Sequence, residues 1–150
     1  MKFGGGWDLD LKDLYTQIIT ESSRATHNRH KVANATHILD GINPSCGDDI
    51  ALELKVSDGI IEDIGFTGVG CAISQASASL MADLIKGKSV EEAKRYADIF
   101  LRMIKGEATE DEIDELEDAS ALRGLAKVPA RVKCAVLAWH TLEGALEEKG

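Results

Sequence analysis

The sequence predicts an α+β fold, a small three-stranded antiparallel sheet with helices packed on one face. Two observations predict this class. Apolar and polar residues alternate over 50–56 and lead through a tight turn into a second apolar run, whereas from residue 71 onward the apolar residues recur at helical spacing. Because so small a sheet is stable only when one face is covered, we expect the helices to supply that cover.

The N-terminal region predicts one amphipathic helix followed by a polar segment. Apolar side chains recur every three or four residues until the helix ends near Ser23, and Asp8 or Asp10 is available as its cap. The stretch 24–34 contains two histidines and two arginines, shows no period and receives no assignment. The apolar positions that define the helix are Leu11, Leu14, Tyr15, Ile18 and Ile19.

The sheet is predicted from one hairpin and one further strand. Ile50, Leu52, Leu54 and Val56 alternate with polar or small residues, which is the period of a strand buried on one face. The sequence Ser-Asp-Gly at 57–59 then predicts a tight turn into the run "IIEDIGF". An earlier strand over about 36–39 is expected to pair with this hairpin.

Two helices are expected directly after the sheet. The first begins at Cys71 and stops near Gly87, and its apolar residues share one face. The second begins with a capping box formed by Ser89 and Glu92 and ends at Gly106. The apolar positions are Ile73, Ala76, Leu80, Met81 and Leu84 in the first helix, and Ala93, Tyr96, Ala97, Phe100, Leu101 and Ile104 in the second.

The C-terminal third holds the acidic concentration of the chain and a last helix. The segment 107–118, "EATEDEIDELED", predicts a short solvated helix and loop. Pro129 is suited to the first turn of the final helix. The apolar stripe of that helix consists of Val132, Ala135, Val136, Trp139, Leu142 and Leu146.

Composition bounds the domain count and excludes two classes of partner. The 150 residues suit a single domain over 1–150. A net charge of −9 and a pI near 4.9 disfavour nucleic acid, because phosphate binding needs a concentrated basic face. No apolar run approaches the roughly 20 residues that cross a bilayer, and the N-terminus lacks a signal-peptide core, so we expect a cytoplasmic protein with no membrane partner.

The three cysteines are placed where a shared site is conceivable. Cys46 lies on the turn "NPSCGD", Cys71 ends "FTGVGC" at a strand-to-helix junction that Gly68 and Gly70 can shape, and Cys134 lies early in the last helix. Helix starts favour thiolates, and Cys134 falls beside the apolar stripe. Three thiolates with a nearby carboxylate suit tetrahedral zinc, provided that the three segments converge. Taken singly, each cysteine is better explained as a small buried apolar residue.

Three segments resemble the U-type iron-sulfur cluster assembly proteins, the family of SufU, IscU and the N-terminal part of NifU. They are "NPSCGD" at 43–48, "FTGVGCAISQASASLM" at 66–81 and "VPARVKCAVLAW" at 128–139, in the same order as in the family and each with one cysteine. The resemblance implies the family's α+β fold. It also implies that Cys46, Asp48, Cys71 and Cys134 gather at one end of the molecule as the metal or cluster site.

Three departures from the IscU pattern favour the SufU branch. Lys133 precedes the last cysteine where IscU usually has histidine, the chaperone motif Leu-Pro-Pro-Val-Lys is replaced by the residues at 127–131, and an acidic insertion spans 107–126. The segment 21–30 also differs from the usual SufU sequence. If that segment contributes to desulfurase docking, the partner surface of this protein differs as well.

The resemblance implies a role in iron-sulfur cluster assembly, with three alternatives for the site. In the first, Cys46 leaves the zinc to accept persulfide sulfur from a SufS-type cysteine desulfurase, and the sulfur passes to downstream assembly proteins, a zinc-dependent sulfurtransferase activity. Asp48 then keeps the ion in place, while Lys133 and Arg131 either offset the negative charge of the site or are ordinary surface cations. In the second, the same residues scaffold an iron-sulfur cluster that is passed to apo-proteins. In the third, the zinc is purely structural.

The four histidines are not expected to act as a catalytic base. His27, His30 and His37 lie close together in one poorly assigned region between the first helix and the hairpin, and His140 lies six residues past Cys134. None has a sequence context that ties it to a nucleophile, so a cysteine hydrolase is disfavoured.

Overall fold

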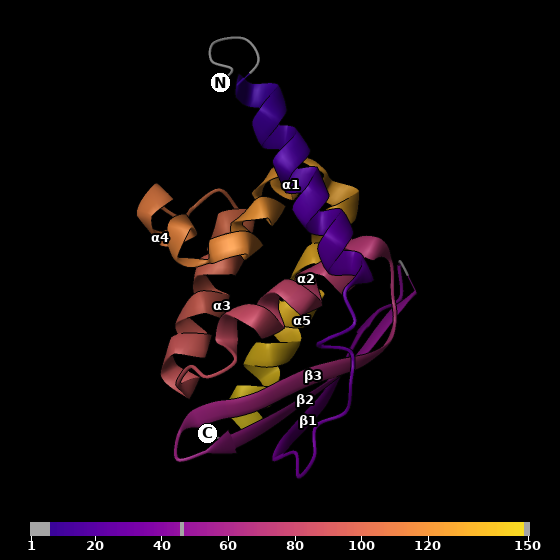
Figure 1. Ribbon diagram of the computed structural model, residues 1–150, viewed down its shortest axis with the longest axis vertical. Coiled ribbons are helices and arrows are strands. Elements are labelled where there is room, and N and C mark those ends of the chain that lie inside the picture. Colours follow the sequence, from indigo (N-terminus) through magenta and orange to yellow (C-terminus); the bar gives the residue numbers. More distant parts are fainter. Residues whose placement is uncertain (1–6, 46, 149–150) are drawn as a thin grey trace.

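The computed structural model describes residues 7–45 and 47–148, with side chains described for 16–45 and 47–147, and it confirms the predicted α+β class. One three-stranded antiparallel sheet is followed by a set of helices (Figure 1). The elements in chain order are α1 (Trp7–Arg24), β1 (His37–Asn43), β2 (Asp48–Ser57), β3 (Ile60–Val69), α2 (Ala72–Ile85), α3 (Val90–Ile104), α4 (Glu110–Glu115), the 3₁₀ segment η2 (Glu117–Lys127) and α5 (Pro129–Glu148).

The sheet has the strand order β1-β2-β3 and contains the predicted hairpin. Asp58 and Gly59 both adopt positive φ, 53° and 76°, as a tight turn between twisted strands requires. β1 continues to Asn43, past the end of the strand predicted at 36–39. The prediction stopped early because Gly41 interrupts the apolar pattern of the sequence. A Cβ at Gly41 would lie 2.0 Å from Thr141 Oγ1, so the strand uses glycine to let α5 approach closely.

The helical layer covers the predicted face of the sheet. α5 packs on β1 and β2, and α2 packs against both β3 and α5. α2 is buried almost all round, wider than the single predicted stripe, because α1 packs on it as well and η2 contacts it from another direction. Trp139 of α5 is wholly buried and stacks on Phe100 of α3 with ring centroids 4.2 Å apart.

The polar segment after α1 lies along the sheet. In Figure 1 it runs as a thin trace from the end of α1 past the strands to β1. The carbonyl of Asn28 accepts a hydrogen bond from Phe66 N at 2.9 Å, and Val32 N donates to Glu53 Oε1 at 3.0 Å. A Cβ at Gly65 would lie 2.2 Å from the His30 carbonyl oxygen, so this segment covers part of the face away from the helices.

Helix α1 ends at Arg24, one residue past the predicted end, but the predicted cap is wrong. The helix begins at Trp7, so Asp8 and Asp10 lie within its first turn. The capping box of α3 is confirmed, since Ser89 accepts from Glu92 N at 3.0 Å and Glu92 accepts from Ser89 N at 3.1 Å.

The acidic segment contains the predicted short helix but is better anchored than predicted. α4 has six residues, and arginines from outside it bind its carboxylates: Arg102 pairs with Glu112 at 2.7 Å, and Arg123 pairs with Glu110 at 2.8 Å. The segment is therefore not merely solvated, because bidentate pairs fix its position against α3 and η2. No helix among the described residues is long and apolar enough to cross a membrane.

Candidate metal centre

Three of the four predicted ligands converge at one end of the sheet. Asp48 opens β2, Cys71 immediately precedes α2, and Cys134 lies in α5. One carboxylate oxygen and the two sulfur atoms lie within 4.8 Å of one another. The fourth predicted ligand, Cys46, lies outside the described residues. The chain thus brings together residues that are 23 and 86 positions from Asp48, as the sequence analysis required for a shared site.

The carboxylate of Asp48 is the most unusual group in the cluster. Its side chain is 1% exposed, and its Oδ1 accepts a hydrogen bond from the Cys71 backbone N–H at 2.9 Å. Oδ2 is buried and has no hydrogen-bond partner among the described residues. A buried carboxylate oxygen without a donor is costly, and coordination to a cation removes that cost. A hard oxygen beside two sulfurs fits the ligand chemistry of zinc.

The local backbone is shaped to let this carboxylate reach Cys71. A Cβ on Gly70 would lie 3.1 Å from Asp48 Oδ1 and 2.3 Å from Ser74 Oγ. Gly68 adopts a φ of 114°, and a Cβ there would lie 2.1 Å from the Asp49 carbonyl oxygen. Both glycines of the "FTGVGC" segment therefore serve the close approach that the sequence predicts.

Cys71 is the partly exposed sulfur of the cluster. It is the N-cap of α2, with extended backbone angles of −71° and 169°. Its sulfur lies 3.9 Å from the hydroxyl of Ser74, which in turn donates to the Cys71 carbonyl at 3.2 Å. The prediction that Cys71 lies at a helix start is confirmed, and this start is the place where the free N–H groups of a helix favour a thiolate.

Cys134 differs from its prediction in two respects. It lies in the second turn of α5, beyond the first four residues whose N–H groups are free, so the helix-start argument does not apply to it. Its side chain is 0% exposed, whereas the sequence placed it beside the apolar stripe. The stripe is itself displaced, since Ala135, Trp139 and Leu142 are buried but Val132 and Val136 are only partly so. α5 is covered on two sides, which an amphipathic pattern does not reveal.

One residue beside the cluster was missed by the sequence analysis. Asn43, the last residue of β1, is 6% exposed, and its Nδ2 donates to Cys134 Sγ at 4.0 Å. In the sheet register Asn43 is paired with Asp48. The sequence shows Asn43 as a polar residue directly before Pro44 in the cysteine turn, which could have drawn attention to it. It does not show that the side-chain amide points into the protein.

The four histidines and the two cations that precede Cys134 lie outside the cluster. The four histidines are all described, and none belongs to the cluster; His27 pairs with Asp83 at 2.8 Å and His140 with Glu143 at 3.5 Å. Arg131 and Lys133 are exposed and line a shallow hollow together with Ser45. Whether they offset the charge of the site stays a prediction.

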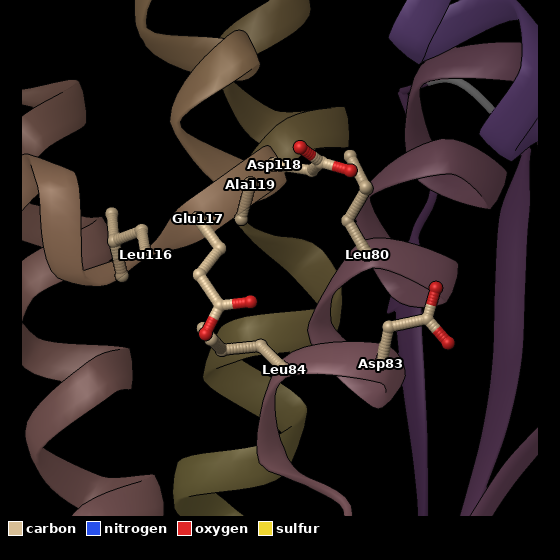
Figure 2. A pocket seen from close by; sticks show the side chains of 7 residues that line it. All are labelled: Leu80, Asp83, Leu84, Leu116, Glu117, Asp118 and Ala119. Atoms are coloured by element: carbon tan, nitrogen blue, oxygen red, sulfur yellow. The ribbon is translucent and has the colours of Figure 1, made fainter.

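A separate small cavity lies between α2 and the start of η2, far along α2 from Cys71 (Figure 2). Its volume is about 110 Å³, and it is lined by Asp83, Glu117 and Asp118 together with apolar residues. Asp83 already binds His27 and Asn28. The cavity holds neither cysteine nor histidine, so it does not compete with the cysteine cluster as a zinc site.

Comparison with known proteins identifies the family of the chain. The family model described as the NifU-like N terminal domain matches residues 14–148. The chain is 43% identical to the zinc-dependent sulfurtransferase SufU of Bacillus subtilis, over 96% of this chain and 97% of that protein. It is 42% identical to the iron-sulfur cluster assembly scaffold protein IscU of Thermotoga maritima, over 92% of this chain and 96% of that protein.

Solved structures share the fold. The crystal structure of FiSufU from Fervidobacterium islandicum AW-1, named as a scaffold protein for the SUF system, superposes with a TM-score of 0.81 at 33% identity and covers 95% of this chain and 99% of its own. A NifU-like N-terminal protein from Brucella abortus, at 24% identity and a TM-score of 0.79, covers 93% of this chain and 99% of its own and supports the fold alone. The chain belongs to the NifU-like N-terminal domain family of iron-sulfur cluster assembly proteins.

Proposed function

We propose that this protein is a zinc-bound sulfur acceptor that takes persulfide sulfur from a SufS-type cysteine desulfurase. The observation that carries the proposal is the buried Asp48 oxygen that lacks a partner among the described residues and lies in one cluster with two cysteine sulfurs. Asp48, Cys71 and Cys134 would hold the ion, and Cys46, two residues before Asp48 in the sequence, would complete four ligands. The similarity to the B. subtilis SufU supports zinc as the metal.

The reaction is a thiol exchange that needs no external oxidant. The Cys46 thiolate attacks the outer sulfur of the donor's persulfide, an S–S bond forms to Cys46, and the bond between the donor's two sulfurs breaks. The donor cysteine leaves as a thiolate and takes up a proton. Bound zinc supplies deprotonated sulfurs that are shielded from oxidation between encounters.

Burial and anchoring disfavour Cys134 and Cys71 as the acceptor, which leaves Cys46. Cys134 is wholly enclosed, so a persulfide on another protein cannot reach it without opening the core. Cys71 is partly exposed, but its backbone N–H is bound by Asp48 and its position as N-cap fixes it to α2. Cys46 lies outside the described residues, and its sequence neighbours Ser45 and Gly47 are both exposed, which supports assigning the acceptor role to this turn.

A scaffold function is the second candidate, because IscU relatives match at almost the same identity as SufU does. The same thiolates can hold a nascent cluster. The acidic insertion and Lys133 in place of histidine favour the first candidate over the second.

The deciding experiment measures desulfurase activity with and without this protein, alongside metal analysis of the same oxygen-free preparation. Stoichiometric zinc, no visible absorbance and faster sulfide production are the expected results. A brown protein with iron and acid-labile sulfide would instead establish the scaffold. The Cys46→Ala variant is expected to keep its fold but lose the stimulation, whereas a purely structural zinc site would show mainly a loss of stability.

A further inference from the structure

The end of β1 places an amide against one of the two described sulfurs. Asn43 lies in the last position of the strand, where the alternation of β1 turns its side chain toward α5. Its Nδ2 donates to Cys134 Sγ at 4.0 Å, and both side chains are buried, at 6% and 0% exposure. Since a thiolate can only accept hydrogen bonds, this amide presents the group that a metal-bound sulfur needs.

The two described sulfurs therefore have unequal surroundings. Cys134 combines complete burial with an N–H donor from Asn43. Cys71 is partly exposed and has the Ser74 hydroxyl at 3.9 Å as its neighbour. A hydrogen bond to a thiolate withdraws charge from the sulfur, which lowers its nucleophilicity and stabilises it as a metal ligand.

We propose that Asn43 is a positioning residue that makes Cys134 the permanent, unreactive anchor of the metal. The inference rests on the proposed zinc site and deepens it. By holding the Cys134 sulfur in place and reducing its charge, the amide directs reactivity to the other ligands of the centre. It also explains why a buried polar side chain follows Leu39 and Gly41 on the inner face of β1, paired with Asp48 in the sheet register.

The test compares the variants Asn43→Leu and Asn43→Ala with the wild type and with Thr141→Val. Thr141 is a matched control, because it is also buried at the interface of β1 and α5 but lies seven residues past Cys134 and donates its hydroxyl to the Leu137 carbonyl. Far-UV circular dichroism of the metal-free proteins verifies that each variant folds, and two variants of different size guard against a misfolded one. The measurements are the zinc dissociation constant by chelator competition and the near-ultraviolet sulfur-to-cobalt absorption band of the Co²⁺-loaded protein.

Both Asn43 variants are expected to bind zinc about 10–100-fold more weakly than the wild type, the usual cost of losing a group that supports a metal ligand. Their cobalt band should move to longer wavelength, because the sulfur loses its hydrogen bond. Thr141→Val should leave both measurements unchanged. Unaltered affinity and band position in the Asn43 variants, with normal binding by the wild type, would overturn this inference and leave the proposed function intact. A wild type that binds neither metal would overturn both.

Discussion

The Asp48 carboxylate and the Cys71 backbone are joined directly: Oδ1 accepts the Cys71 N–H at 2.9 Å, while the second oxygen of the same carboxylate is buried without a partner among the described residues. One residue thus connects the start of β2 to the start of α2 and offers an oxygen into the cysteine cluster. Stability and metal binding make different demands on this side chain, and the first prediction separates them.

Asp48→Asn should retain the bond to Cys71 N–H and lose the charged oxygen. Without metal the variant is expected to be at least as stable as the wild type, because a buried charge has been removed. Zinc at 100 times its dissociation constant should stabilise the wild type by about 2.7 kcal/mol, or roughly 5–10 °C in Tm for a chain of this size, and should stabilise the variant by less. Thermal unfolding with and without zinc measures both. A metal-free variant that unfolds well below the metal-free wild type would contradict the assigned role.

Gly70→Ala should weaken metal binding although it replaces none of the proposed metal ligands. The new methyl group would lie 3.1 Å from Asp48 Oδ1 and 2.3 Å from Ser74 Oγ, so the carboxylate and the hydroxyl must both shift. We expect at least about a tenfold loss of zinc affinity, as for other changes that displace a ligand's support. Gly124→Ala is the control, since a methyl group there meets nothing within 4 Å. Equal zinc titration curves for the two variants would show that Gly70 has no such role.

Ser77→Ala should destabilise the packing between α2 and α5. The Ser77 hydroxyl accepts from Trp139 Nε1 at 2.9 Å and donates to the Ala135 carbonyl at 2.6 Å, and all three residues are buried. The variant leaves the indole N–H unsatisfied, so we expect a loss of about 1–3 kcal/mol in the free energy of unfolding.

Urea unfolding measures this loss, and Ser79→Ala is its matched control on the same helix. Ser79 is also buried, but the Asn28 amide that approaches its hydroxyl at 3.5 Å keeps shorter bonds to the Ser79 carbonyl and to Asp83. The control should therefore lose clearly less stability. An equal loss of stability in both variants would show that the hydrogen bonds of Ser77 to Trp139 and Ala135 do not account for the effect.

The pair of Arg102 and Glu112 should make stability depend on acid pH. Hydrogen bonds from the Arg102 guanidinium, with a smaller contribution from the Thr109 backbone N–H, lower the pKa of Glu112 from 4.5 to about 2 in the folded protein. Because the folded pKa lies below the unfolded one, the contribution to stability is complete above pH 4.5 and is lost as the pH falls toward 2. The Tm difference between the wild type and Glu112→Gln should therefore be largest near neutral pH and shrink through this window.

Asp111→Asn provides the comparison for that pH series, because Asp111 lies on the same short helix and is exposed. Its Tm difference from the wild type should be small at every pH. A difference for Glu112→Gln that stays constant between pH 5 and pH 2.5 would exclude the ion pair as its source.

Much of the fold could be predicted because it is encoded locally. The alternation at 50–56, the Asp58-Gly59 turn and the Ser89/Glu92 capping box each depend on neighbours in sequence, and all three are confirmed. The errors fall where tertiary contact overrides a local pattern. The predicted first strand ended too early because Gly41, which makes room for Thr141 of α5, interrupts its apolar pattern. The cap of α1 was misplaced because two aspartates precede the apolar residues in the sequence.

The sequence by itself determined the chemistry that this chain can offer: three cysteines and an aspartate on three motifs, and the pattern of a sheet under helices. Only the tertiary structure decided that Asp48, Cys71 and Cys134 lie within 4.8 Å of one another, that Cys134 is enclosed, and that Asn43 turns inward to it. The physical reason is that burial and hydrogen bonding arise between elements far apart in sequence. The packing of α5 on β1 and α2 fixes them, and no local period records that packing.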